Sequence, residues 1–96
     1  MRIRYTPRAF ADREAIFEYL ENRSPQGAQA VKRAIENSIR RLEQFPYSAR
    51  ATDEPGVREL IVPQRPYKVY YRVVGDEVWI VHIRHAARRP WQREGD

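Results

Sequence analysis

Residues 67–85, YKVYYRVVGDEVWIVHIRH, decide the fold of this chain. β-branched and aromatic residues recur on both sides of Gly75-Asp76, at the alternating spacing that β-strands favour. A Gly-Asp pair suits the two-residue turn of a β-hairpin. The stretch therefore predicts two antiparallel strands, over about 67–74 and 77–85.

This turn also predicts which side chains share a face of the sheet. If Val74 lies opposite Glu77, the residues divide into two sets. The more apolar set comprises Val69, Tyr71, Val73, Val78, Ile80 and His82. The other comprises Lys68, Tyr70, Arg72, Trp79, Val81, Ile83 and His85. We expect the first set to lie beneath helices and the second to form an open face, although a slip of one residue would exchange the faces of one strand.

The sequence before these strands predicts a first strand and two helices. Ile3 and Tyr5 alternate with arginines, as in a short strand. Thr6-Pro7 and Ser24-Pro25 are helix-start signals, because Thr and Ser cap a helix and proline at the first position loses no hydrogen bond. They predict helices over about 8–22 and 25–44. The first helix places Phe10, Ile16, Phe17 and Leu20 on one face.

The second helix has the clearest periodicity in the chain. Its apolar stripe, with three- and four-residue steps, comprises Ala28, Val31, Ile35, Ser38, Ile39, Leu42 and Phe45. Pro46 ends the helix. Residues 46–56 are rich in turn-forming residues and predict a loop, and a further strand is predicted at about 57–62.

The predicted fold is α+β, with the element order β-α-α-β-β-β. Two consecutive helices cannot cover both faces of a small sheet, so we expect a helical hairpin packed on one face of a small antiparallel sheet. The 96 residues are enough for one domain, spanning 1–96. The polar tail from about residue 89 is predicted to be flexible.

Composition limits the classes of function. The net charge of +5 favours anionic partners. The absence of cysteine excludes disulfides and thiolate chemistry, and with only two histidines a structural zinc site is not expected. No apolar run approaches the length of a membrane span, and the N-terminus lacks the apolar core of a signal peptide. We expect a cytoplasmic protein with no cofactor, no metal and no membrane partner.

The composition of the open face predicts a surface that binds a partner. Basic groups interleaved with aromatic ones can hold a phosphate backbone, and an open sheet face can also hold a peptide or a partner helix. The candidate partner-binding residues are Arg58, Tyr70, Trp79, Arg84, Arg88 and Arg89. The alternative is that Lys and Arg stems only cover apolar sheet while their charged heads stay in water.

The same face is the candidate site for any chemistry. Metal-free cleavage of RNA needs positive charge for the phosphate and a group that moves a proton. Lys68 and Arg72 are candidates for the charge, and His85 for the proton. A surface histidine without a catalytic role is the alternative for His85.

Several stretches resemble the RelE/ParE superfamily of toxins from bacterial type II toxin–antitoxin systems. They are TPRAFADREAIFEYL, RRLEQFP, GVRELIVPQRPYKVYYRV, VVGDEVWIV and HIRHAARRPW, and together they cover nearly the whole chain. The resemblance implies a helical hairpin on an antiparallel sheet. It also implies a growth-inhibiting toxin that is neutralised by a cognate antitoxin, whose C-terminal segment wraps the toxin. An acidic segment would suit this basic chain. The assembly that the resemblance implies is either a dimer or a heterotetramer with the antitoxin.

The superfamily divides by activity, and this sequence is more similar to the ParE branch. ParE-like members inhibit DNA gyrase by binding, whereas RelE-like members cut mRNA on the ribosome. Lys68 stands where RelE-like nucleases tend to carry arginine, and no tyrosine follows His85. The resemblance thus predicts a gyrase inhibitor that takes part in plasmid stabilisation. The alternatives are a ribosome-dependent mRNA endonuclease that uses Lys68, Arg72 and His85, and a degenerate toxin kept for pairing with its antitoxin.

Overall fold

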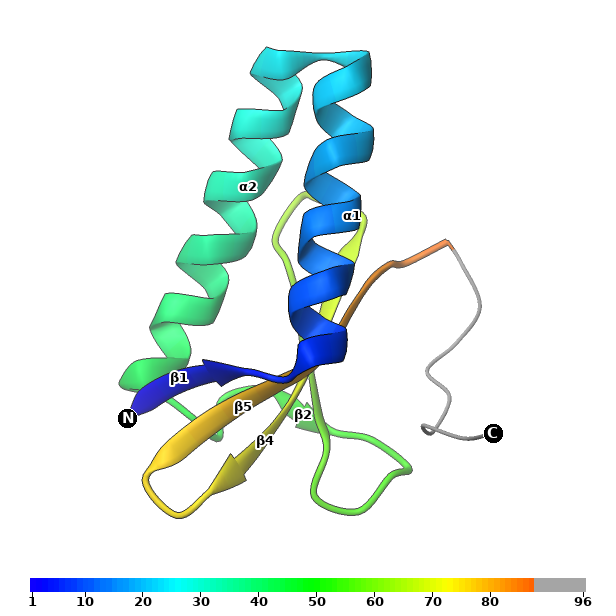
Figure 1. Cartoon of the computed structure of the whole chain (residues 1–96). Helices are drawn as coiled ribbons and strands as arrows, with labels where there is room; N and C mark the ends of the chain where they lie inside the picture. The colour runs from blue at the N-terminus through cyan, green and yellow to red at the C-terminus, as the bar shows by residue number, and fades with distance from the viewer. Residues whose placement is uncertain (88–96) are drawn as a thin grey trace.

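Two helices cover one face of a five-stranded sheet in the computed structural model, which describes residues 1–87 (Figure 1). The elements, in chain order, are β1 (Arg2–Tyr5), α1 (Pro7–Arg23), α2 (Pro25–Arg40), the 3₁₀ turn η1 (Arg41–Glu43), β2 (Arg50–Ala51), β3 (Arg58–Ile61), β4 (Tyr67–Val74) and β5 (Glu77–His85). The predicted α+β class and the order of its elements are confirmed. Strand β2 was missed, because two residues are too few to show a period. No helix in residues 1–87 has the length and apolarity of a membrane span.

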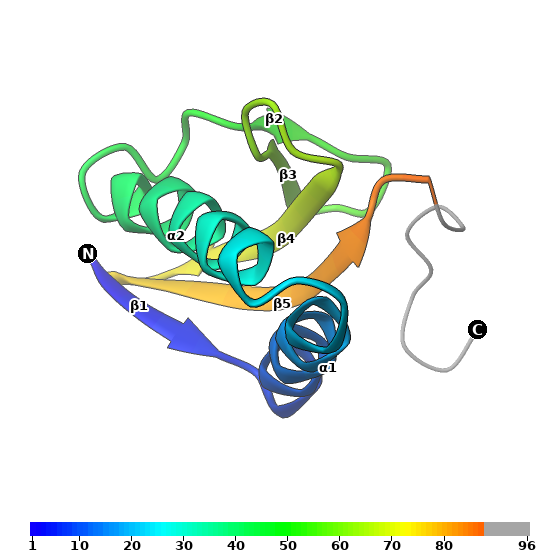
Figure 2. The same cartoon turned by 90° about the horizontal axis from the view of Figure 1, so that it is seen from above.

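The sheet has the strand order β1-β5-β4-β3-β2. Strands β2 to β5 pair antiparallel with their neighbours, as expected. Strand β1 instead lies parallel to β5, so the sheet is mixed. Figure 2 shows β1 at the outer edge beside β5, with both helices above the same face of the sheet.

Both helix-start signals are confirmed. The Thr6 hydroxyl accepts a hydrogen bond from the Ala9 amide at 3.1 Å, and the Ser24 hydroxyl accepts one from the Gly27 amide at 3.1 Å. Pro7 and Pro25 occupy the first helical positions. Each cap satisfies an amide that the helix itself leaves unpaired.

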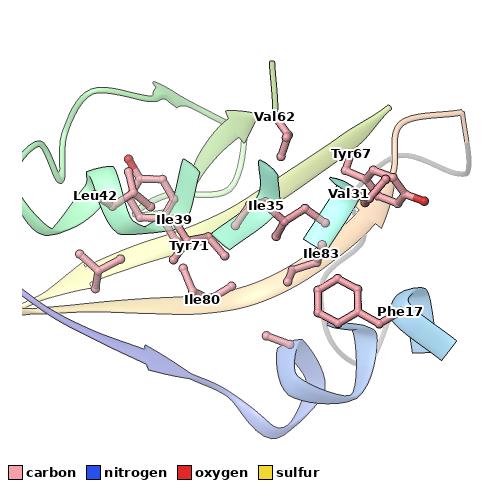
Figure 3. Close-up of a cluster of buried hydrophobic side chains, with 13 residues drawn as sticks. Phe17, Val31, Ile35, Ile39, Leu42, Val62, Tyr67, Tyr71, Ile80 and Ile83 are labelled. Atoms are coloured by element: carbon pink, nitrogen blue, oxygen red, sulfur yellow. The ribbon is translucent and has the colours of Figure 1, made fainter. Parts of the chain in front are cut away.

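The core lies between the helices and the sheet (Figure 3). From α2 and η1 it takes the predicted stripe, because Ala28, Val31, Ile35, Ser38, Ile39 and Leu42 are all buried. The prediction is wrong for two residues that were expected in the core: Phe10 is 53% exposed and Phe45 is 57% exposed. The buried Ala9 sets the face of α1, which turns Phe10 outward. The 3₁₀ turn has about three residues per turn, so it shifts Phe45 away from the helical stripe.

The pairing of β4 with β5 begins at Val74 and Glu77 as predicted, but a bulge interrupts it. Tyr71 pairs with Ile80, whereas Tyr70 pairs with His82, so Val81 is an extra residue on β5. The predicted faces are therefore wrong beyond Ile80. Ile83 lies in the core, His85 shares the helix-covered side with Tyr67, and His82 does not belong to the core set.

The bulge coincides with the end of β1. The last β1 pair joins Tyr5 to Ile80, and beyond it Thr6, which caps α1, and Asp12 of α1 supply the missing partners of β5. The Thr6 amide donates to the Ile80 carbonyl at 3.0 Å, and the Thr6 hydroxyl donates to the Val81 carbonyl at 3.4 Å. The Asp12 carboxylate accepts from the Ile83 amide at 3.1 Å and lies 2.6 Å from His82 Nδ1. Thr6 and the Asp12 side chain thus close an edge that would otherwise stay open.

Candidate functional site

The side of the sheet away from the helices carries most of the predicted site residues. We call it the helix-free face. The register places on it Arg2, Arg4, Arg50, Glu59, Lys68, Tyr70, Arg72, Glu77, Trp79, His82 and Arg84. Cations outnumber carboxylates, in agreement with the predicted basic surface.

Glu59 is the centre of a polar network on this face. The residue is only 8% exposed, and its carboxylate accepts hydrogen bonds from the Tyr70 hydroxyl at 2.9 Å and from Arg50 Nη2 at 2.8 Å. Lys68 Nζ lies 3.7 Å away. The Tyr70 hydroxyl in turn accepts from Arg84 Nε at 3.1 Å. The network satisfies a carboxylate that would be costly to bury alone.

The network shifts the pKa values of two of its members, Glu59 and Tyr70. Burial alone would raise the pKa of Glu59, but the hydrogen bonds from Tyr70 and Arg50, with the charges of Lys68 and Arg50, outweigh it and lower the pKa. Burial raises the pKa of Tyr70, and the Glu59 carboxylate adds to this, although Arg84 opposes it. Tyr70 therefore stays protonated and donates to an ionised Glu59.

A second set of contacts surrounds Trp79, which lies between Arg4 and Arg72 in the register. Glu77 accepts from Arg4 Nε at 2.9 Å and from the Trp79 indole at 3.2 Å. The hydrogen bond from Arg4 is the main cause of the lowered pKa of Glu77. Arg72 donates to the Pro55 carbonyl at 3.1 Å and lies 3.6 Å from Glu54.

The structure brings only some of the predicted partner-binding residues onto one surface. Trp79 and Arg84 lie on the helix-free face, but Tyr70 is 1% exposed, so its ring is not available for stacking. Arg58 is on the opposite side, because it pairs with Tyr71, and its guanidinium donates to the Ala49 carbonyl at 2.7 Å. Arg88 and Arg89 lie outside the described residues.

The three catalytic candidates are divided between the two sides of the sheet. Lys68 and Arg72 occupy the helix-free face, four residues apart on β4, which places their backbones about 13 Å apart. His85 lies on the helix-covered side, where its ring makes an edge contact with Tyr67 at 5.3 Å between centroids. The bulge at Val81 causes this separation, and one reacting phosphate could not contact all three.

The structure contains a groove that no pattern in the sequence indicated. The groove has a volume of about 930 Å³ and lies between the helices, the loop after β3 and the ends of β4 and β5. Its lining residues are Arg8, Asp12, Ala15, Ile16, Tyr19, Leu20, Val31, Gln64, Arg65, Pro66, Tyr67, His82, Ile83, Arg84, His85 and Ala87.

The groove combines an apolar floor with cationic side chains. Ile16, Leu20, Val31 and Ile83 supply apolar contact, while Arg8, Arg65 and Arg84 add positive charge. Such a site suits an acidic segment that also carries apolar side chains.

The loop after β3 forms one wall of the groove. The Arg65 amide donates to the Val62 carbonyl at 3.3 Å, which closes a turn with Pro63 and Gln64 in its centre. Gln64 has a φ of 60°, a conformation that favours glycine. The Pro-Gln-Arg-Pro run indicated this turn, but not that it borders a groove. Among residues 1–87, no three side chains of His, Cys, Asp or Glu gather as a metal site would require.

The fold is that of the RelE/ParE superfamily of toxins. Residues 3–90 match the family described as the ParE toxin of the type II toxin–antitoxin system, parDE, and the chain belongs to this family.

Individual relatives agree with this assignment. The chain is similar to toxin RelE2 of Caulobacter vibrioides, with 38% identity over 88% of this chain and 93% of that protein. It is also similar to the putative toxin Y4kP of Sinorhizobium fredii, with 34% identity over 88% of each. A solved structure of the chromosomal ParDE toxin–antitoxin system from P. aeruginosa superposes with a TM-score of 0.79 and 28% identity, over 88% of this chain and 95% of that one.

Proposed function

We propose that this toxin inhibits growth by binding DNA gyrase in the cytoplasm, without chemistry of its own, and contributes to plasmid stabilisation. Residues 1–96 act as a single toxin domain. The observation that carries the proposal is the position of the candidate catalytic residues relative to carboxylates and to the two sides of the sheet. Lys68 and Arg72 both lie beside carboxylates, and His85 is on the other side of the sheet. This arrangement favours a binding surface over a reacting one.

The proposal includes a cognate antitoxin that neutralises the toxin. The groove supports this partner, since its apolar floor and three arginines complement an acidic segment with apolar side chains. The structural similarity to a ParDE toxin–antitoxin system also supports it. Such a segment would order on binding, as disordered partners do.

A ribosome-dependent mRNA endonuclease is the second candidate. The observation that favours it is the 38% identity to a toxin named RelE2. On this alternative Lys68 and Arg72 would hold the phosphate and His85 would move the proton. The two sides of the sheet would then have to act on different parts of the RNA.

Purified components separate the two candidates. Gyrase is assayed for supercoiling of a relaxed plasmid with the toxin, and again with toxin that was first mixed with its antitoxin. We expect the toxin to block supercoiling or to trap cleaved DNA, and the antitoxin to reverse the effect. Normal supercoiling, together with cleavage of mRNA on ribosomes, would replace this proposal by the second one.

A further inference from the structure

Two aromatic side chains project from the segment that follows η1. Phe45 is 57% exposed and Tyr47 is 61% exposed, on either side of the half-buried Pro46. We call Phe45, Pro46 and Tyr47 the aromatic knob. None of the three lines the groove. Large aromatic rings are costly to leave in water, so a pair of them on one short segment needs an explanation.

The segment that carries the knob is firmly attached to the body of the protein. The Tyr71 hydroxyl donates to the Pro46 carbonyl at 2.8 Å, and Ser48 Oγ donates to the Phe45 carbonyl at 2.8 Å. Arg58 donates to the Ala49 carbonyl at 2.7 Å, and its guanidinium carbon lies 5.2 Å from the centre of the Tyr47 ring. The backbone that carries the rings is thus held in place, and ordering it on binding would cost little conformational entropy.

Positive charge accompanies the knob. Arg40 and Arg41 precede Phe45 in the chain by five and four residues, and both are exposed; Glu43, which is also exposed, lies between them and Phe45. Arg58 lies beneath Tyr47. Two copies of this surface would bring like charges together, which disfavours self-association. An acidic partner is favoured instead.

We propose that the aromatic knob is the surface by which the toxin docks on its folded target protein, where it enters an apolar pocket with an acidic rim. The inference rests on the proposed function, since it names the surface that acts on the target. A projecting, pre-organised pair of aromatic anchors with neighbouring arginines has the composition of an interface hot spot. The groove has the opposite shape, and it suits an extended segment of the antitoxin.

The double variant Phe45→Ser/Tyr47→Ser tests the proposal, with Phe10→Ser as its matched control. Phe10 is 53% exposed, lies on α1 and does not line the groove. Both variants remove exposed rings, so both should melt close to wild type. Each is assayed for growth inhibition on expression, for inhibition of gyrase, and for affinity toward the purified antitoxin.

We expect the knob variant to lose growth inhibition and about tenfold or more in potency against gyrase, the loss that one hot-spot residue gives. Its affinity for the antitoxin should change by less than about twofold, and Phe10→Ser should match wild type in all three assays. A knob variant that stays fully toxic would overturn the proposal. So would one that loses antitoxin binding together with toxicity, because the knob would then belong to the antitoxin site.

A failure of the proposed function gives a different pattern. If the wild-type toxin does not inhibit gyrase, gyrase is not the target. If the knob variant is then non-toxic while it still binds the antitoxin, the knob remains the docking surface for another target protein.

Discussion

Two neighbouring tyrosines on β4 are buried in different ways. Tyr71 is 0% exposed and faces the helices, where apolar side chains of the core cover it (Figure 3). Tyr70 is 1% exposed and faces the helix-free side, where no second layer of secondary structure lies within residues 1–87. Its cover is polar: the His82 ring stacks on it at 5.8 Å, the Arg84 guanidinium lies 5.7 Å from its ring, and Glu59 binds its hydroxyl.

This difference shows that side chains on the two faces of one sheet are covered by different kinds of interaction. On the helix-covered side, stability depends on the volume of apolar groups and should respond little to salt or pH. On the helix-free side, it depends on a satisfied charge network, which responds to both. The following predictions test that contrast.

The largest effect is expected from Ile35→Ala. Ile35 is 1% exposed in the middle of α2, and the cavity left by this change should lower the free energy of unfolding by about 2–5 kcal/mol. Urea denaturation at low and high salt should give the same loss. The matched control is Ile61→Ala on β3, which is 55% exposed and should change stability by less than about 0.5 kcal/mol. Equal losses at the two positions would contradict the contrast between the faces.

Glu59→Gln tests the polar network. The amide keeps the size of the side chain but loses an acceptor and the charge, so the free energy of unfolding at pH 7 should fall by about 1–3 kcal/mol. The folded-state pKa of Glu59 is lowered, so its ionisation stabilises the fold above the unfolded pKa of about 4.3, and this stability is lost as pH falls through the folded pKa. The gap between wild type and variant should therefore narrow in acid. A gap that stays constant from pH 7 to pH 3 would refute the role of Glu59.

A smaller effect is expected where α1 closes the edge of β5. Thr6→Ala removes a helix cap, which costs about 1 kcal/mol, and also the hydrogen bond to the Val81 carbonyl. Ser24→Ala removes only a cap, on an exposed turn. Thermal unfolding should show the larger loss for Thr6→Ala. Equal losses would mean that the edge contact adds nothing to stability.

The order of elements and the core stripe of α2 could be predicted because they depend on local patterns. Thr6-Pro7 and Ser24-Pro25 specify helix starts through the chemistry of neighbouring residues, and Ile35 lies mid-stripe at regular helical spacing. Phe45 shows the limit of periodicity. It continues the α-helical stripe in sequence, but the turn at η1 changes the phase.

The site could be predicted less completely, because it depends on contacts distant in sequence. The bulge at Val81 coincides with the end of β1 and with the contact of Asp12 to β5, and no local pattern in β5 indicates either feature. One extra residue exchanges the faces of His82, Ile83 and His85. The groove likewise needs residues from both helices and three later segments, so only the assembled fold reveals it.

Lys68→Ala is expected to have the smallest effect, on toxicity as well as on stability. Lys68 lies 3.7 Å from Glu59, and that carboxylate keeps its closer bonds to Arg50 and Tyr70 when the lysine is removed. We therefore expect growth inhibition on expression to persist and antitoxin binding to be retained. Loss of toxicity in a variant that melts like wild type and still binds its antitoxin would mean that the Lys68 ammonium contacts the target or the RNA directly. The helix-free face would then react with the RNA or contact the target, and docking would not be confined to the aromatic knob.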